Sequence, residues 1–214
     1  MHIVPDVLPA ISLTADVALL FAHSPIKPGE FVHSSISAQP PKLSVQVFDK
    51  GERLVTVAVV DSDVPNLDTD GFDSRCHFLA INVPVSPISR AVSLRKLDAG
   101  EGSGKVVLPW MSPTAMKGSP YHRLSVFVLQ QGDGKMKIDV AEAVVKFKRQ
   151  GFSMRKLVRR YRLTPIGASL FRTQWDDGMD EVMAGIGDKG AEMELRRRRV
   201  EPLPYKKKDG ARYR

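Results

Sequence analysis

The 214-residue sequence contains a single cysteine, Cys76, so no disulfide bond can form within the chain. This is typical of a protein from a reducing compartment, or of a fold that needs no covalent cross-link. Long apolar runs are also missing. The longest, at residues 54–60, is interrupted by Thr56 and is far shorter than a membrane span. The sequence therefore predicts a globular chain with no membrane-spanning helix.

Lysine and arginine are absent from residues 1–26, which include Asp6 and Asp16. A mitochondrial presequence would be rich in arginine and poor in acidic residues. A secretory signal would begin with positive charge before its apolar core. We therefore expect no targeting peptide within this chain.

Motifs for catalysis and metal binding are missing as well. The sequence has no Gly-x-Ser-x-Gly elbow, no glycine-rich phosphate loop and no pair of closely spaced cysteines. Cys76 and His77 are neighbours in a predicted strand, so their side chains point to opposite faces and cannot form a nucleophile–base pair. We expect Cys76 to be a core residue, and we expect no enzymatic activity, metal or cofactor.

Positive charge is concentrated near the C-terminus. The chain has a formal net charge of +8 and an isoelectric point near 9.7. Residues 1–145 hold 13 Lys and Arg against 15 Asp and Glu, whereas residues 146–214 hold 19 against 9. Such asymmetry indicates a polyanionic partner for the C-terminal part. Nucleic acid and an anionic membrane surface are the two possible partners.

The pattern of apolar residues predicts a mainly β fold. Alternation at residues 43–48 and a β-branched run at residues 53–60 predict two strands joined as a hairpin by the turn at 49–52. Further strands are predicted at 77–83 and 123–130. Residues 61–76 and 97–121 are polar and rich in Gly and Pro, so we expect long connections there.

Helices are predicted only in the last third of the chain. Ser153 is a suitable N-cap for a helix over residues 154–161, which would end before Thr164-Pro165. A second helix is predicted over 188–199, with Pro202 and Pro204 beyond it. Residues 205–214 show no hydrophobic pattern, and we expect them to be disordered until a partner binds.

Several segments together resemble the phosphatidylethanolamine-binding protein family. Residues 54–65 end in Val-Val-Asp-Ser-Asp-Val-Pro, similar to the family's Asp-Pro-Asp-Ala-Pro strand end. Residues 76–84 contain Cys-His-Phe and end in Asn-Val-Pro, and residues 117–124 read Lys-Gly-Ser-Pro-Tyr-His-Arg-Leu. Residues 152–177 resemble the family's closing helix and its Trp-Asp-Asp strand. The order and spacing of these segments also agree with the family.

The resemblance implies a pair of packed antiparallel sheets with peripheral helices. It divides the chain into a domain over residues 1–183 and a basic C-terminal extension over 184–214. It also implies a small anion pocket lined by Asp61, Asp63, His77 and His122. Leu124 replaces the family's tyrosine and Pro120 replaces its second loop glycine, while Gly178 replaces an aromatic residue. These changes remove hydrogen-bond donors, so we expect a weakened pocket.

The Asp-Gly-Phe-Asp sequence at residues 70–73, the Cys-His-Phe sequence and the basic extension are similar to one branch of the family. That branch occurs in the large subunit of the mitochondrial ribosome. The resemblance implies a structural role in the mitochondrial matrix, with rRNA and neighbouring large-subunit ribosomal proteins as partners and no free homo-oligomer. It also implies that this chain begins inside a longer protein. The alternative is a phospholipid- or phospho-ligand-binding regulator of kinases or proteases.

Two groups of cations are predicted to contact RNA phosphates, because arginine and lysine near tyrosines are typical of nucleic-acid arms. A solvated tail and a nuclear-localisation signal are the alternatives for the first group. The first group comprises Arg196, Arg197, Arg198, Arg199, Lys206, Lys207, Lys208, Arg212 and Arg214, and the second comprises Arg155, Lys156, Arg159 and Arg160. Phosphate contacts carry no base identity, so we expect shape-directed binding.

Overall fold

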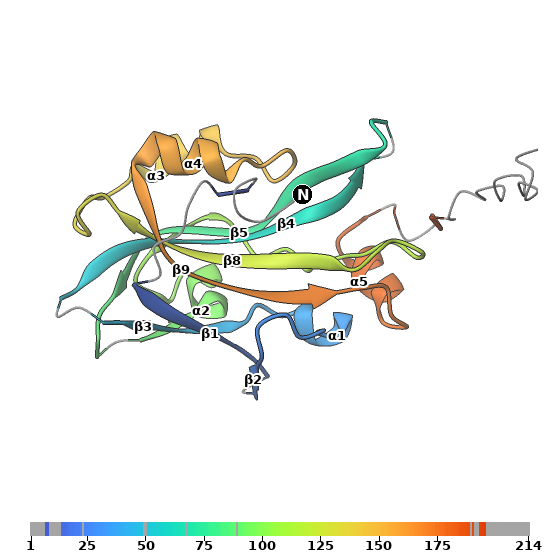
Figure 1. The fold of residues 1–214 in the computed structure, drawn as a ribbon, viewed down its shortest axis with the longest axis horizontal. Coiled ribbons are helices and arrows are strands. Elements are labelled where there is room, and N and C mark those ends of the chain that lie inside the picture. The colour runs from blue at the N-terminus through green and yellow to red at the C-terminus, as the bar shows by residue number, and fades with distance from the viewer. Residues whose placement is uncertain are drawn as a thin grey trace, which may run out of the picture.

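The computed structural model describes residues 7–8, 14–22, 24–48, 51–66, 68–88, 90–188, 190 and 193–195. In this part of the chain two antiparallel sheets are stacked, and a pair of helices covers the outer face of the larger sheet (Figure 1). The fold is therefore mainly β with peripheral helices, as predicted.

The smaller sheet has four strands in the order β2-β1-β3-β6. They are β1 (Ala15–Phe21), β2 (Ser24–Ile26), β3 (Lys42–Val47) and β6 (Ala91–Ser93). Its strands alternate buried and exposed residues, because only one face meets the core. The short helices α1 (Ser34–Ser37) and α2 (Leu94–Asp98) belong to the same side of the molecule (Figure 1).

The larger sheet has five strands in the order β7-β5-β4-β8-β9. They are β4 (Arg53–Asn66), β5 (Gly71–Val85), β7 (Lys105–Leu108), β8 (His122–Gln131) and β9 (Leu163–Thr173). The helices α3 (Val140–Lys146) and α4 (Met154–Tyr161) lie together on its outer face, and α5 (Met179–Gly185) lies at one end of the molecule (Figure 1).

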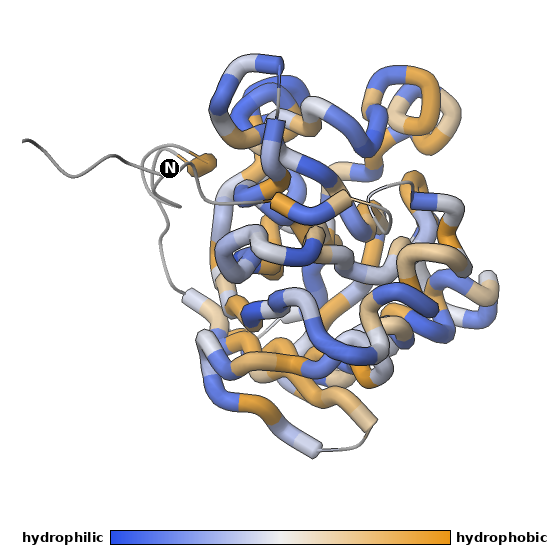
Figure 2. Tube along the Cα trace, turned by 90° about the vertical axis from the view of Figure 1, so that its right-hand side faces the viewer, coloured by the Kyte–Doolittle hydropathy of each residue, from blue (hydrophilic) through white to orange (hydrophobic). Residues whose placement is uncertain are grey.

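Two hydrophobic clusters sandwich the larger sheet. One fills the space between the sheets and includes Leu43, Val57 and Phe171. The other lies under α3 and α4 and includes Phe127 and Leu157. The centre of β4 is buried on both faces because it has a cluster on either side. Hydrophobic and hydrophilic residues alternate along much of the traced chain, as expected for elements with one covered side (Figure 2).

The helix over residues 154–161 is confirmed with both of its predicted ends. The Ser153 side chain accepts a hydrogen bond from the Lys156 N–H and caps the first turn. Arg162 then adopts a left-handed conformation with φ of 48°, which stops the helix before β9. Leu157 and Tyr161 are buried against the sheet, so the basic residues face outward.

The predicted hairpin between residues 43–48 and 53–60 is wrong. Both segments are strands, but β3 pairs with β1 and β6, whereas β4 pairs with β5 and β8 in the other sheet. The expected loop at 61–76 is also wrong. There β4 and β5 continue as a paired arm with Val64 opposite Asp73, and this arm projects beyond the sheet (Figure 1). A short strand, β7, lies within the expected connection at 97–121.

The predicted helix over 188–199 is not supported where that stretch is described. Asp188 is in a loop, and Glu194 forms a parallel bridge with Lys117. The expected domain boundary between residues 183 and 184 falls inside α5. Residues 196–214, including the expected disordered tail, lie outside the described residues. No helix among the described residues has the length and apolar character needed to span a membrane.

Candidate functional site

Asp61 and His122 form a buried pair on the neighbouring strands β4 and β8. The Nδ1–H of His122 donates to Oδ2 of Asp61 over 2.7 Å, and both side chains are almost fully buried. The other carboxylate oxygen of Asp61 accepts from the backbone N–H of Asp63 at 2.8 Å. The carboxylate is thus enclosed by donors from its own chain, and it orients the His122 ring toward Ser119.

Asp63 forms an ion pair with Arg123 and no hydrogen bond to His77 or His122. The guanidinium donates from Nε over 2.7 Å and from a terminal nitrogen over 2.6 Å, one bond to each carboxylate oxygen. The backbone N–H of Arg123 adds a third bond at 3.0 Å. Such a bidentate pair fixes both side chains. It raises the pKa of Arg123, mainly through the hydrogen bonds to Asp63.

His77 is buried on β5 and held by a backbone carbonyl. Its Nδ1–H donates to the Met111 carbonyl at 2.9 Å, and its Nε2 has no hydrogen-bond partner. Burial lowers the pKa of His77 to about 4, and the nearby charge of Asp61 offsets this only in part. The neighbouring Cys76 is a core residue, as expected, and burial raises the pKa of its thiol to about 12.

A hollow of about 190 Å³ lies beside His122. Arg75 and Thr114 also line it, and Asp188 reaches in from the segment that follows α5. A guanidinium nitrogen of Arg75 lies 3.2 Å from Oδ2 of Asp188, and the Thr114 hydroxyl lies 3.3 Å from the same oxygen. Of the four predicted pocket residues, His122 lines this hollow. Asp61 does not line the hollow but accepts a hydrogen bond from His122. Asp63 is paired with Arg123, and His77 donates to the Met111 carbonyl.

Asp188 places a carboxylate where the donors of the hollow converge. Burial alone would raise its pKa, but the N–H of Gly190, at 3.0 Å, and the charge of Arg75 outweigh burial and lower the pKa below its ordinary value. The carboxylate is therefore charged at neutral pH. Its oxygens accept the hydrogen bonds of Arg75 and Thr114, as the oxygens of a small bound anion would.

The segment after α5 is packed against the loop that precedes β8. Met179 and Met183 of α5 contact Ala115, and the Leu195 N–H donates to the Lys117 carbonyl at 2.8 Å. Gly118 has φ of +79°, and a Cβ added there would lie 2.0 Å from the Leu195 carbonyl oxygen. Only glycine permits this close approach, so the loop is shaped to receive the segment that carries Asp188.

Asp176 of the Trp-Asp-Asp sequence has a structural role. Its carboxylate accepts from the Ser34 N–H at 2.8 Å and from the Ser34 hydroxyl, and it also accepts from the Gly178 N–H at 3.1 Å. These bonds tie the start of α5 to α1. A Cβ at position 178 would lie 2.8 Å from the Ser34 hydroxyl, which explains glycine where the resemblance led us to expect an aromatic residue.

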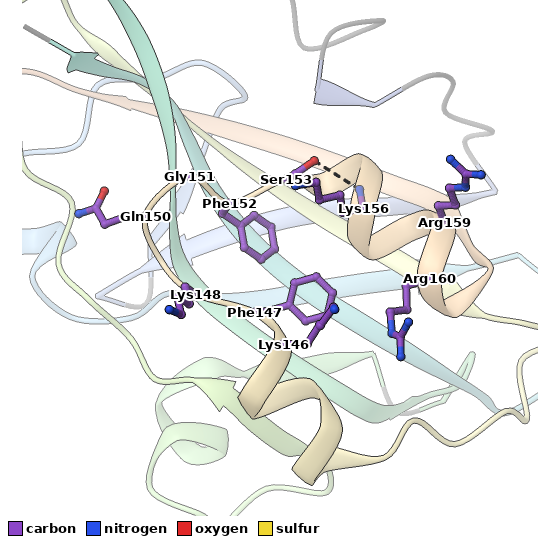
Figure 3. A pocket seen from close by; sticks show the side chains of 10 residues that line it. All are labelled: Lys146, Phe147, Lys148, Gln150, Gly151, Phe152, Ser153, Lys156, Arg159 and Arg160. Atoms are coloured by element: carbon purple, nitrogen blue, oxygen red, sulfur yellow. Dashed lines mark hydrogen bonds between the residues drawn. The ribbon is translucent and has the colours of Figure 1, made fainter. Parts of the chain in front are cut away.

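The predicted basic surface of α4 is exposed at Arg155, Lys156, Arg159 and Arg160. Three of these cations line a second hollow, a groove of about 610 Å³ between the end of α3 and the start of α4 (Figure 3). Arg155 lies outside this groove. The other predicted RNA-binding cations, at 196–199, 206–208, 212 and 214, lie outside the described residues.

Sequence reasoning missed Arg75, Thr114 and Asp188 in the first hollow, and Lys146 and Lys148 in the second. Arg75 lies in the stretch expected to be a connection, and β5 has a register irregularity at His77, so two-residue alternation does not link the two side chains. Asp188 lies 113 residues from Arg75, and no local signal connects them. In the described part of the chain no group of three or more His, Cys, Asp or Glu could hold a metal ion.

The comparisons agree with this fold. The model of the phosphatidylethanolamine-binding protein family matches residues 22–163. The phosphatidylethanolamine-binding protein of Plasmodium vivax superposes with a TM-score of 0.60 at 14% identity, covering 82% of this chain and 94% of that one. The Plasmodium falciparum protein gives 0.56 at 18% identity, covering 80% and 92%. At such identities the likeness concerns the fold alone.

A further relative is the large ribosomal subunit protein mL38 of Schizosaccharomyces pombe. It is 29% identical to this chain over 198 residues, which are 91% of this chain and 59% of that protein. The chain therefore spans about three fifths of the length of this curated relative.

Proposed function

The chain belongs to the phosphatidylethanolamine-binding protein family, and on that premise we propose that it is a structural component of the large subunit of the mitochondrial ribosome. In this role it acts in the mitochondrial matrix without catalysing a reaction. It contacts rRNA and neighbouring large-subunit proteins.

One observation carries the proposal, namely the extent of the similarity to mL38. The family model ends at residue 163, whereas the similarity to mL38 covers 91% of the chain. It must therefore include most of β9, α5 and the segment that carries Asp188. That segment carries Asp188, which lines the hollow at His122, so the similarity to a ribosomal protein extends over the part of the chain that contributes to this hollow.

The chemistry of the hollow supports a structural role. A pocket that binds free phosphate-type ligands needs unpaired donors, whereas Arg75 and Thr114 already share the Asp188 carboxylate. Asp63 is similarly neutralised by Arg123. A ligand would have to displace an internal ion pair before it could bind.

RNA contact is the second element of the proposal. Residues 146–214 carry 19 Lys and Arg against 9 Asp and Glu, whereas the rest of the chain is nearly balanced. Cations without acidic partners gain free energy by neutralising phosphates and releasing counterions. The C-terminal arginines and lysines and the outward cations of α4 are the residues we assign to this contact.

A regulator that binds phospho-ligands is the second possible function. The convergence of Arg75, Thr114 and His122 on one hollow favours it, because these groups could hold a phosphate if Asp188 moved away. This function leaves the basic C-terminal part without a role unless that part binds an anionic membrane.

Depletion of the protein separates the two functions. A structural component is needed for its particle, so depletion should reduce the amount of large-subunit rRNA in the mature mitochondrial particle, measured across a sucrose gradient. The small-subunit rRNA peak is the internal control. An unchanged large-subunit peak after complete depletion would argue against the structural role.

A further inference from the structure

The groove between α3 and α4 gathers cations from both helices and from the loop that joins them. It is lined by Lys146 at the end of α3, by Lys148 in the loop that follows, and by Lys156, Arg159 and Arg160 of α4. Its remaining lining residues are neutral: Phe147, Gln150, Gly151, Phe152 and Ser153. Five cations and no carboxylate therefore surround one concave surface.

The walls of the groove are held in place by the sheet beneath them. The Cys76 N–H donates to the Arg149 carbonyl at 2.9 Å, and the Phe152 N–H donates to the Ser74 carbonyl at 3.1 Å. These bonds fasten the loop between the helices to β5. The Ser153 cap fixes the start of α4 on the other side (Figure 3). The groove is preformed, which reduces the entropy lost when a ligand binds.

Most of the cations are available to a partner. Arg160 is paired with Glu142 at the exposed edge of the groove. Lys146, Lys148, Lys156 and Arg159 form no ion pair with any other described residue. Exposed cations that share a concave surface repel one another, and a polyanion relieves that repulsion.

The buried phenylalanines of the groove determine whether the bases or the backbone of a nucleic acid could bind there. Phe147 and Phe152 lie beside each other in the middle of the groove, with ring centroids 6.0 Å apart (Figure 3). Their side chains are only 8% and 4% exposed. They pack into the cluster under α4 and offer no free face on which a base could stack. The groove therefore presents charge and no exposed aromatic face, and its neutral polar side chains are those of Gln150 and Ser153, the second of which caps α4.

We propose that this groove binds the sugar–phosphate backbone of RNA, with Lys146, Lys148, Lys156 and Arg159 contacting phosphates. The inference rests on the proposed ribosomal function and specifies one of its contact surfaces. We expect this binding to be independent of base identity, because contacts to phosphates carry no sequence information. A membrane surface fits the groove less well, because membrane binding inserts exposed aromatic side chains and those of this concave surface are buried.

The test compares two charge-matched variants of the full chain in binding to a uridine homopolymer RNA. K148Q/K156Q neutralises one cation on each side of the groove. K42Q/K96Q is the control, because it neutralises two exposed lysines on β3 and α2, in the opposite layer of the molecule. The slope of log affinity against log salt should fall by about 1.4 in the groove variant, since each neutralised phosphate contributes about 0.7 for a single strand. The control slope should match the unmodified chain.

Three results would overturn the inference. Equal slopes for both variants would mean that the groove does not contact the RNA. A tenfold preference for one homopolymer over another that is lost in the groove variant would mean base recognition. Binding to phosphatidylserine-containing vesicles that depends on Lys148 and Lys156, with RNA binding unchanged, would identify a membrane surface. All three results are measured on purified protein, whereas sedimentation with ribosomes is measured in a lysate. A protein that fails to sediment with ribosomes would contradict the proposed function but would not decide whether the groove binds RNA.

Discussion

The carboxylate of Asp188 lies 3.2 Å from the guanidinium of Arg75, inside the hollow beside His122. The two residues are 113 positions apart in the sequence. Their pairing joins the segment after α5 to β5, and it gives the donors of the hollow an acceptor from the same chain. The Asp188 carboxylate thereby makes the hollow part of the protein's own packing.

Removing the Asp188 carboxylate should open the hollow to small anions. In Asp188→Ala, Arg75 and Thr114 lose their shared acceptor, and a phosphate can replace it. We expect inorganic phosphate to bind at least about tenfold more tightly than to the unmodified chain, equivalent to about 1.4 kcal/mol, measured by calorimetric titration. Glu181→Ala removes an exposed carboxylate from α5 and is the matched control. Equal phosphate affinity in the two variants would show that the Asp188 carboxylate does not keep phosphate out of the hollow.

Gly118 should be needed for the docking of residues 193–195. Gly118→Ala places a Cβ against the Leu195 carbonyl, so the bond from the Leu195 N–H to Lys117 should break. The Leu195 amide should then exchange its hydrogen faster, as measured by NMR or mass spectrometry. Gly100→Ala is the control, because Gly100 has a similar φ of +77° but no atom within 4 Å of the added Cβ. Unchanged protection of Leu195 in Gly118→Ala would contradict the packing described above.

His77 should make the fold less stable in mild acid. Its pKa is about 4 in the folded protein, against an ordinary value of 6.5, and burial is the main cause. Between these values the unfolded chain binds a proton that the folded chain does not. The free energy of unfolding should therefore decrease as the pH falls from 6.5 to 4, by up to about 3 kcal/mol from this residue. Below pH 4 this contribution no longer changes.

Urea denaturation at several pH values measures the total effect, and NMR titration of the His77 ring isolates its source. A His77 ring that titrates near pH 6.5 in the folded protein would be inconsistent with its burial.

The buried pair of Asp61 and His122 should matter more to stability than the exposed pair of Glu142 and Arg160. Asp61→Ala leaves the His122 Nδ1–H and the Asp63 N–H without their acceptor. We expect a loss of about 3 kcal/mol in the free energy of unfolding, since each buried unsatisfied group costs about 1–3 kcal/mol. Glu142→Ala breaks a solvent-exposed pair and should cause no measurable change. Chemical denaturation of both variants measures the difference, and similar losses would refute this ranking.

The sequence predicted β3, β8, helix α4 and parts of β4 and β5, because these depend on local patterns, but apolar alternation did not identify the other strands or helices α1 to α3. Leu43, Val45 and Val47 alternate with polar residues, and Ser153 begins α4 through a short-range cap. The pairing of β3 was mispredicted, because alternation reports which side of a strand is buried and carries no information about its partner. The arm of β4 and β5 was missed, since a pair that projects from the core needs no hydrophobic alternation.

The candidate site was only partly accessible from the sequence. Motif resemblance indicated Asp61 and His122, which the fold brings within hydrogen-bond distance. The same resemblance included Asp63 and His77, whose partners Arg123 and Met111 are fixed by packing. Asp188 comes from a segment predicted to be helical. Its position depends on a tertiary contact between α5 and the loop at Gly118, which no local pattern encodes.

Sedimentation of the tagged full chain from a mitochondrial lysate, with and without RNase, tests the ribosomal role most directly. We predict that the protein comigrates with the large ribosomal particle and moves to slow-sedimenting fractions after RNase treatment. A protein that sediments slowly in both samples would contradict the ribosomal role and would direct attention to the hollow at Arg75 and His122.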